Sequence, residues 1–366
     1  MNKQMIVAGL KARPVRTTVS ILAVALEVIL ILIVVGLTTG ITSETAKRTA
    51  GVGAEIMVQP PNSSMFLALT NNTMPVAIAD KIRELPGVQS VAPVQVLMNS
   101  KDGVEVVFGI DPENFNAVTG GFSWHQGSVF KGPDEIVVDD LWARAKPAIV
   151  GDTVELLNHK FKIAGIVEHG KGARIFTSRE GTGALTGQVD KVGVFFVKVK
   201  NPDEVKVALD QLNKLLPGYT IWDVNEWVAL MTSTNIPGLN AFIQAVVVVA
   251  LCIGVMVIFL SMYTTITERT REIGILRSLG ASKAFIVSLI FQEATFVCFL
   301  GVIFGIGSSF LIEKVLEVVF PTLMVQITGE WIVKASVFAL LSGVIGSLYP
   351  SLKAAKQDPV EALAYE

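Results

Sequence analysis

The chain has 366 residues, of which 51% are hydrophobic and only 17% are charged, and its mean hydropathy is +0.56. This composition is too apolar for an ordinary soluble globular protein, so part of the chain is expected to lie in lipid. The formal net charge is -2, which indicates no broad basic face, and nucleic acid is not an expected partner.

Four apolar stretches are long enough to cross a membrane, because a spanning helix needs about 20 mostly apolar residues. They cover residues 17–40, 241–265, 285–312 and 331–349. The first stretch follows a basic segment but is longer than the apolar region of a secretory signal peptide, which has about 7 to 15 residues. We therefore expect it to be a retained membrane anchor.

The distribution of Lys and Arg predicts the orientation of the chain. Basic residues are concentrated in the N-terminal tail, in residues 266–284 and in the tail 350–366, whereas the loop 313–330 holds mainly acidic residues. Both termini are therefore expected in the cytoplasm. Four crossings then place residues 41–240 outside, and this segment is long enough for a domain.

The outer segment has the pattern of a mixed α/β domain with two similar halves, about 41–110 and 189–230. In each half a helical pattern ends at a Leu-Pro-Gly sequence, at Leu85-Pro86-Gly87 and at Leu216-Pro217-Gly218, and a strand pattern follows. The halves suggest an internal repeat, although helix-Pro-Gly-strand is also a common connection. Residues 111–188 between them are rich in strand and turn signals and are expected to form a β-rich insertion.

The expected fold class is a membrane protein with four transmembrane α-helices. A large extracytoplasmic α/β domain, which contains the β-rich insertion, lies between helices 1 and 2.

The sequence contains no motif that supports catalysis or metal binding by this chain. Cys252 and Cys298 lie in apolar runs and are expected to pack there, and the three histidines lack the spacing of a zinc site. The triplet Gly170-Lys171-Gly172 lacks the length and the following Ser or Thr of a Walker A loop. We therefore expect a non-catalytic subunit with no cofactor and no metal of its own.

The apolar stretches contain two acidic residues, Glu27 and Glu293, and too few other polar groups to line a water-filled channel. Glu27 lies near mid-span and is expected to face a helix interface or to be protonated. A structural hydrogen bond and a role in transport both remain open for it. Small residues that favour close helix contacts recur in the third and fourth stretches, namely Gly301, Gly305, Gly307, Gly343 and Gly346.

Residues 264–294 predict a short amphipathic helix followed by a turn. Ile273 and Leu276 lie on one face, and pairs of opposite charge three residues apart lie on another. Gly280 begins a break before the third apolar stretch. A helix on the membrane surface and a helix that docks to a partner would both have this pattern.

Within this segment, ERTREIGILRSLGAS closely resembles the cytoplasmic segment of ABC transporter permeases of the FtsX-like, MacB type. The C-terminal sequences YPSLKAAK and DPVEAL resemble the end of the same family, and DEIVVDDLWARAK and VGDTVELLNHKFKIAGIVE resemble its MacB-like periplasmic core. The resemblance covers nearly the whole chain.

The resemblance implies a permease of a bacterial inner membrane that works as a homodimer or with a sister permease. A separate ATP-binding subunit would hold ATP and Mg, and its motion would be transmitted to the outer domain, which handles cargo already outside the membrane. Residues 1–16 would form an amphipathic segment on the inner surface, and residues 266–284 would form a coupling helix and turn. The implied contacts with the ATPase are Glu268, Arg269, Arg271, Glu272, Ile273, Leu276, Arg277 and Gly280.

The cargo stays open, and lipoprotein, lipid, peptide and drug are all compatible with the resemblance. A periplasmic adaptor or a lipoprotein is a further expected partner, besides the membrane lipid. The alternative function is that of an FtsX-like regulator of a cell-wall enzyme. A membrane enzyme would require a polar cluster in the outer domain that the sequence does not show.

Overall fold

The structure is a computed structural model that describes residues 14–65, 72–100, 105–232, 236 and 238–358. The chain divides into two compact units. Residues Ile41–Ile236 together with Val319–Met324 form one of them, called here the α/β unit. The rest of the described chain forms the helical unit. Residues 1–13 of the expected N-terminal segment 1–16 lie outside the described residues.

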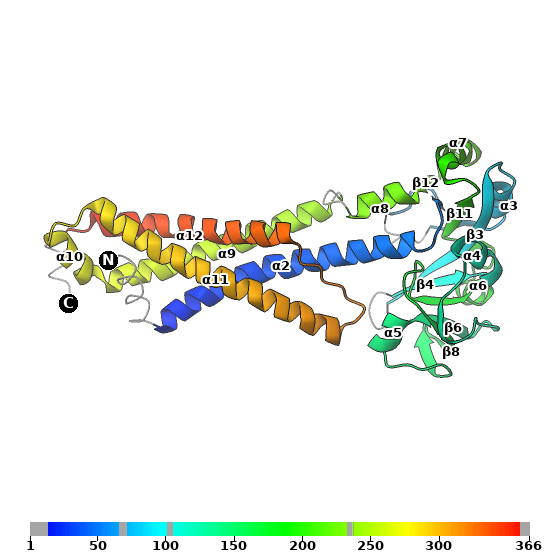
Figure 1. Cartoon of the computed structure of the whole chain (residues 1–366), viewed down its shortest axis with the longest axis horizontal. Coiled ribbons are helices and arrows are strands. Elements are labelled where there is room, and N and C mark those ends of the chain that lie inside the picture. Colours follow the sequence, from blue (N-terminus) through cyan, green and yellow to red (C-terminus); the bar gives the residue numbers. More distant parts are fainter. Residues whose placement is uncertain (1–13, 66–71, 101–104, 233–235, 237, 359–366) are drawn as a thin grey trace. The chain divides into compact units, whose positions relative to one another are not determined.

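The helical unit consists of long apolar helices gathered in a bundle (Figure 1). These are α2 (Pro14–Ala50), α9 (Leu239–Glu268), α11 (Lys283–Val319) and α12 (Gly329–Lys356), and the short α10 (Thr270–Ser278) joins α9 to α11. The four long helices have the length and composition to cross a membrane. They contain the four stretches that the hydropathy of the sequence indicates.

Each of these helices continues beyond its apolar stretch. Helix α2 runs on through ITSETAKRTA to Ala50 and ends before Gly51 and Gly53, the latter with a left-handed φ of 78°. Helix α11 continues to Val319, with Lys314 paired to Glu317 at 2.7 Å, and ends before Pro321. Helix α12 continues to Lys356. Residues 313–319 and 329–330 of the expected loop 313–330 are therefore helical, as are residues 350–356 of the expected tail 350–366. Apolarity marks the length of a helix that faces lipid and does not mark where the helix ends.

Glycines allow the long helices to approach one another closely. A Cβ on Gly301 or Gly305 would lie 2.6 or 2.7 Å from the Cβ of Val24 or Val28 on α2. Gly343 and Gly346 of α12 are equally close to α11 and α9. The expected small-residue contacts are confirmed at these four positions and wrong at Gly307, where a Cβ would meet no atom of another described element within 4 Å.

The α/β unit is built on a sheet of ten strands in the order β12-β1-β11-β3-β4-β9-β6-β8-β5, with β7 paired to β8, and a separate pair β10-β2. The first strands are β1 (Ile56–Gln59), β2 (Met74–Pro75), β3 (Val88–Asn99), β4 (Glu105–Ile110), β5 (Trp124–Gly127) and β6 (Glu135–Asp139). The others are β7 (Thr153–Leu156), β8 (His159–Val167), β9 (Ile175–Ser178), β10 (Lys191–Val192), β11 (Val194–Val199) and β12 (Thr220–Asp223).

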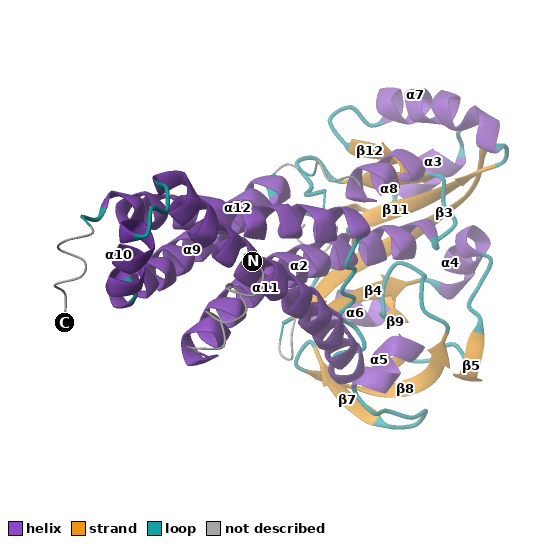
Figure 2. Ribbon diagram, turned by 60° about the vertical axis from the view of Figure 1, so that its left-hand side comes forward, coloured by secondary structure: helices purple, strands orange, loops and turns teal. Residues whose placement is uncertain are grey.

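Short helices accompany these strands (Figure 2). They are α3 (Ile78–Arg83), α4 (Pro112–Thr119), α5 (Asp140–Ala145), α6 (Arg179–Thr186), the 3-10 helix η2 (Pro202–Glu204), α7 (Val205–Leu215) and α8 (Val224–Thr232).

The two Leu-Pro-Gly sequences end α3 and α7 as predicted. Gly87 and Gly218 adopt left-handed φ angles of 92° and 87°, and β3 and β12 follow directly. Ile82 of α3 and Leu212 of α7 are fully buried in one apolar core with residues of β1, β3 and β11. Both helices therefore cover the same part of the sheet.

The segment 111–188 contributes strands β5 to β9, and these strands extend the same sheet. Strand β9 pairs in parallel with β4, with Val107 opposite Ile175, and antiparallel with β6. The segment also contains α4, α5 and α6, which the strand-rich reading of the sequence did not include. Each begins at a side-chain cap, on Asp111, Asp139 and Ser178.

Replacing Gly301 with Val should destabilise the helical unit by about 1–3 kcal/mol, because the new side chain would overlap Val24 on α2. Gly307→Val on the same helix is the matched control, since open space surrounds that position. Thermal unfolding of the purified full chain in detergent measures both. Equal melting temperatures for the two variants would contradict this account of the α2–α11 contact.

Candidate functional site

The α10 segment lies at one end of the helix bundle, between the end of α9 and the start of α11 (Figure 1). Arg269 separates α9 from α10, with φ -104° and ψ 17°, so the chain turns at this residue without losing its hydrogen bonds. Gly280 has a left-handed φ of 95° and ends the segment. The predicted short helix and break are both present.

The apolar face of α10 packs against the bundle. Ile273 is buried, and Leu276 is half-buried against the same core, which includes Ile266, Ile286 and Ala354. Among the residues expected to bind a partner, these two are therefore occupied by contacts within the chain. They set the rotation of α10 about its own axis.

Arginine side chains tie this end of the bundle together. Arg269 donates from Nη1 to both carboxylate oxygens of Glu293 on α11, at 3.4 and 3.1 Å. Arg277 donates from Nη1 to the carbonyl oxygens of Ala355 and Gln357 at the end of α12, at 2.9 and 2.8 Å. Arg16 at the start of α2 forms an ion pair with Glu268 of α9.

Two of these contacts bond the α10 segment to α11 and α12, and the third joins α2 to the end of α9, from which α10 continues. The side chains of Arg269 and Glu293 are only 18% and 11% exposed, so this pair is screened by little water. Glu293, which the sequence marked as an acidic residue inside an apolar stretch, is thus the anchor of the α10 segment. A displacement of α10 would act on α9, α11 and α12 through directional bonds.

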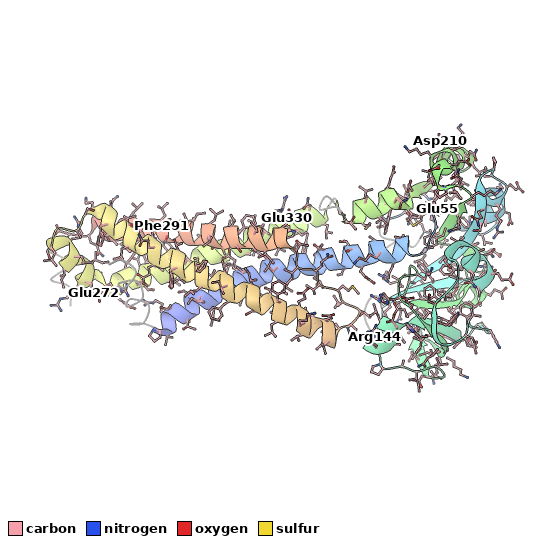
Figure 3. All side chains as sticks on the ribbon, in the orientation of Figure 1. Glu55, Arg144, Asp210, Glu272, Phe291 and Glu330 are labelled. Carbon is pink, nitrogen blue, oxygen red and sulfur yellow. The ribbon has the colours of Figure 1, made fainter. Side chains whose placement is uncertain are left out.

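The opposite face of α10 is exposed. It carries Arg271 and Glu272, and Figure 3 shows Glu272 at this end of the bundle, with Glu330 at the other end. Ile275 is 43% exposed and Leu279 is 80% exposed. These two apolar side chains, four residues apart, join the charged pair on one surface. The sequence pattern contained this spacing, but the packing of Ile273 and Leu276 was needed to show that it faces outward.

Glu27 lies inside the bundle, 3% exposed, and not at the α10 surface. Ser342 of α12 donates to Oε2 of Glu27 at 3.0 Å, and a Cβ on Gly254 of α9 would lie 2.0 Å from the same oxygen. The expectation that Glu27 faces a helix interface is confirmed. Within the described residues its other oxygen, Oε1, has no hydrogen-bond partner.

The described part of the chain contains no group of three or more His, Cys, Asp or Glu residues that could hold a metal ion. His159 pairs with Asp134 and His169 with Asp140, both at 2.8 Å and near the surface. Although burial opposes it, hydrogen bonds from His169 and Arg144 hold the pKa of Asp140 below its usual range. These contacts are those of solvated structural histidines.

Comparison with known proteins identifies two family models in the chain. The model described as MacB-like periplasmic core domain matches residues 17–215, and the FtsX-like permease C-terminal model matches residues 245–359. The chain is 25% identical to the macrolide export ATP-binding/permease protein MacB of Shewanella sp. (strain W3-18-1), over 99% of this chain and 60% of that protein. The chain thus spans about three fifths of the length of this relative.

Two further similarities concern parts of the chain. The probable syringafactin export ATP-binding/permease protein SyfD of Pseudomonas syringae pv. syringae is 31% identical, over 50% of this chain and 29% of that protein. The crystal structure of the periplasmic region of MacB from Actinobacillus actinomycetemcomitans aligns with a TM-score of 0.37 and 17% identity, over 52% of this chain and 97% of that one.

The chain has four apolar helices, a large α/β unit inserted after the first of them, and a short exposed helix between the second and third. This arrangement is that of a membrane permease. The chain belongs to the ABC transporter permease family that combines an FtsX-like permease domain with a MacB-like periplasmic core domain. The resemblance carried by ERTREIGILRSLGAS is confirmed.

Replacing Arg269 with Gln should destabilise the helical unit by about 3 kcal/mol, because it leaves the nearly buried carboxylate of Glu293 without its partner. Replacing both residues with Gln should recover most of the loss. Thermal unfolding of the purified chain measures the effect, with Arg271→Gln on the exposed face as the control. A loss in the double variant as large as in the single one would refute the pairing.

Proposed function

We propose that this chain is the membrane subunit of an ABC transporter that transmits ATP-driven motion to its α/β unit. A separate ATPase subunit, which holds ATP and Mg, docks on the exposed face of α10. The movement of α10 is passed along the helices, and the α/β unit exports or extracts cargo from the outer side of the membrane. Lipoprotein, lipid, peptide and drug are the cargo classes compatible with this mechanism.

The structure of the α10 segment is the observation that carries the proposal. One face of α10 is bonded to the bundle by Arg269 and Arg277, whereas the other presents Arg271, Glu272, Ile275 and Leu279. A surface that combines charged and exposed apolar side chains on a firmly held helix is suited to bind a groove of a partner protein. The bonds to α11 and α12 provide a route by which docking moves the long helices.

The distribution of basic residues supports the orientation that this mechanism needs. The loop that contains α10 and the C-terminal tail carry the excess of Lys and Arg, so we place both termini and α10 on the cytoplasmic side. The α/β unit then lies outside the inner membrane of a bacterium. There we propose that it meets its cargo and an adaptor or lipoprotein, as part of a homodimer or a pair with a sister permease.

The interior of the bundle supports movement of the helices more than passage of cargo between them. Its buried core is mostly apolar, with a few serine hydroxyls such as Ser309 and Ser347, and Glu27 in its middle is held by Ser342 against Gly254. A hydrophilic path would require several polar side chains that face one another. We therefore assign to the helices the role of transmitting force.

Reversing the charges of the exposed pair, with Arg271→Glu and Glu272→Arg in one chain, should reduce the captured ATPase about tenfold, equivalent to about 1.4 kcal/mol. The substituted side chains are exposed, so the amount of chain in the membrane should stay the same. Affinity purification from gently solubilised native membranes, with quantitative mass spectrometry and an ATP hydrolysis assay, measures both.

The matched control is the double reversal Glu330→Lys with Lys334→Glu, an exposed pair at the other end of the bundle. It should leave the captured ATPase unchanged. Unchanged capture by the α10 variant would count against docking at α10. Recovery of a wall hydrolase together with the ATPase would favour the regulatory alternative.

A further inference from the structure

Four charged side chains form a nearly buried cluster in the α/β unit, where the last turns of α2 lie. The cluster consists of Glu44 and Arg48 on α2, Asp139 at the end of β6, and Arg174 just before β9. Their side chains are 9%, 16%, 1% and 11% exposed, in that order. Two guanidinium groups balance two carboxylates, so the cluster has no net charge.

Arg174 is the residue that joins the members of this cluster. Its Nη1 donates to Oδ2 of Asp139 at 3.0 Å, and its Nη2 donates to Oε1 of Glu44 at 3.3 Å. The same Nη2 lies 3.5 Å from the carbonyl oxygen of Thr322, in the segment between α11 and α12. One side chain thus bonds three parts of the chain that are far apart in sequence.

The backbone beside Arg174 contacts the end of α2 closely. The amide of Gly172 donates to the carbonyl oxygen of Arg48 at 2.9 Å. A Cβ on Gly51 would lie 1.9 Å from the carbonyl oxygen of Gly170, and Gly170 and Gly172 both have left-handed φ angles. The triplet Gly170-Lys171-Gly172, which cannot bind a nucleotide as a Walker A loop, therefore serves as a contact for α2.

The cluster is also tied to the sheet. Asp139 accepts a hydrogen bond from the amide of Trp142 at 2.7 Å through Oδ1 and so caps α5, while its other oxygen binds Arg174. Burial raises the pKa of Asp139, and the Arg174 guanidinium only partly offsets this effect. Asp139 lies on β6, which pairs with β8 and β9. A pull on Arg174 therefore acts on this part of the sheet.

Buried ion pairs differ from apolar packing in one respect that is relevant here. Apolar contacts depend on close packing and carry no fixed bond direction, whereas a buried charge must also keep its particular partners at hydrogen-bond distance. The planar guanidinium group also fixes the direction of its bonds. The cluster consequently resists any displacement of α2 relative to β6.

We infer that Arg174 is a positioning residue that passes the movement of α2 and of the α11–α12 segment to β6, α5 and β8 of the α/β unit. Helix α2 begins beside the α10 segment, where Arg16 pairs with Glu268, and runs without interruption to Ala50. The inference rests on the proposed function. It adds the place at which force leaves the helix and enters the sheet.

The test compares distances across the junction with and without nucleotide, in the full chain bound to its co-purified ATPase. Nitroxide labels are attached to Ile41→Cys on α2 and Lys160→Cys on β8, two exposed positions of the α/β unit, in a background of Cys252→Ser and Cys298→Ala. Double electron-electron resonance measures the distance between the labels. ATP with vanadate supplies the trapped state.

With Arg174 present, we expect a narrow distance distribution that stays the same when ATP and vanadate are added. In Arg174→Gln we expect the distribution to shift only when ATP and vanadate are added, while the complex keeps its ATPase rate. Arg144→Gln is the matched control, because Arg144 pairs with Asp140 in the same unit but is 63% exposed. It should behave like the unsubstituted chain.

A second variant keeps the test decisive if Arg174→Gln does not fold. Arg174→Lys retains the charge but cannot hold both carboxylates with a planar fork, so it should show a smaller shift of the same kind. Distances in the folded variants that do not respond to nucleotide, or that are altered equally in its absence, would overturn the inference and leave the cluster a purely structural role. If the unsubstituted chain captures no ATPase, the proposed function itself fails and the inference falls with it.

Discussion

Water is absent from the hydrocarbon layer, so each polar group that enters a membrane span must find its partner within the protein. This constraint arranges the helical unit. Its buried interior is mainly apolar, and besides Glu27 with Ser342 it holds serine hydroxyls such as Ser20, which pairs with Ser261 at 2.6 Å. Its least exposed charged contacts lie at the α10 end, where Arg269, Arg277 and Arg16 have acidic or carbonyl partners. The helices pack mainly through apolar contacts along their length and through directional polar contacts at the α10 end. Such a bundle has few polar bonds in its middle that a movement of the helices would have to break.

The α/β unit follows a different rule, because strands supply most of its polar pairing. Its ten-stranded sheet pairs the backbone hydrogen-bonding groups of both halves of the unit. Each half has its own apolar core, one around α3 and α7 and the other around Trp142 and Phe161. Between the sheet and the last turns of α2 the contact is ionic, through Arg174. Polar contacts thus occur both at the α10 end of the bundle and where the last turns of α2 contact the α/β unit. These are the two places where the proposed mechanism requires force to pass from one element to another.

Local patterns in the sequence were sufficient for several features of this fold. Hydropathy located the four long helices, and the Leu-Pro-Gly sequences located two helix ends. The spacing of Ile273 and Leu276 placed them on one face of α10, but the family resemblance implied contacts with an ATPase, whereas they pack inside the bundle. The short helices α4 to α6 were missed, although the caps Asp111 and Asp139 are visible signals. Pairs such as Arg174 with Glu44, 130 residues apart, depend on the topology and leave no local pattern.

The contact between Glu27 and Gly254 has a consequence for the evolution of this chain. The carboxylate occupies the space in which a Cβ at position 254 would lie, so the two positions are coupled. An Ala at 254 would displace the Glu27 carboxylate from its hydrogen bond with Ser342, whereas a shorter residue at 27 would leave room for it. Homologues should therefore either hold this acid and glycine together or lack both, and the pair would serve as a marker of the subgroup that shares this arrangement of α2 and α9.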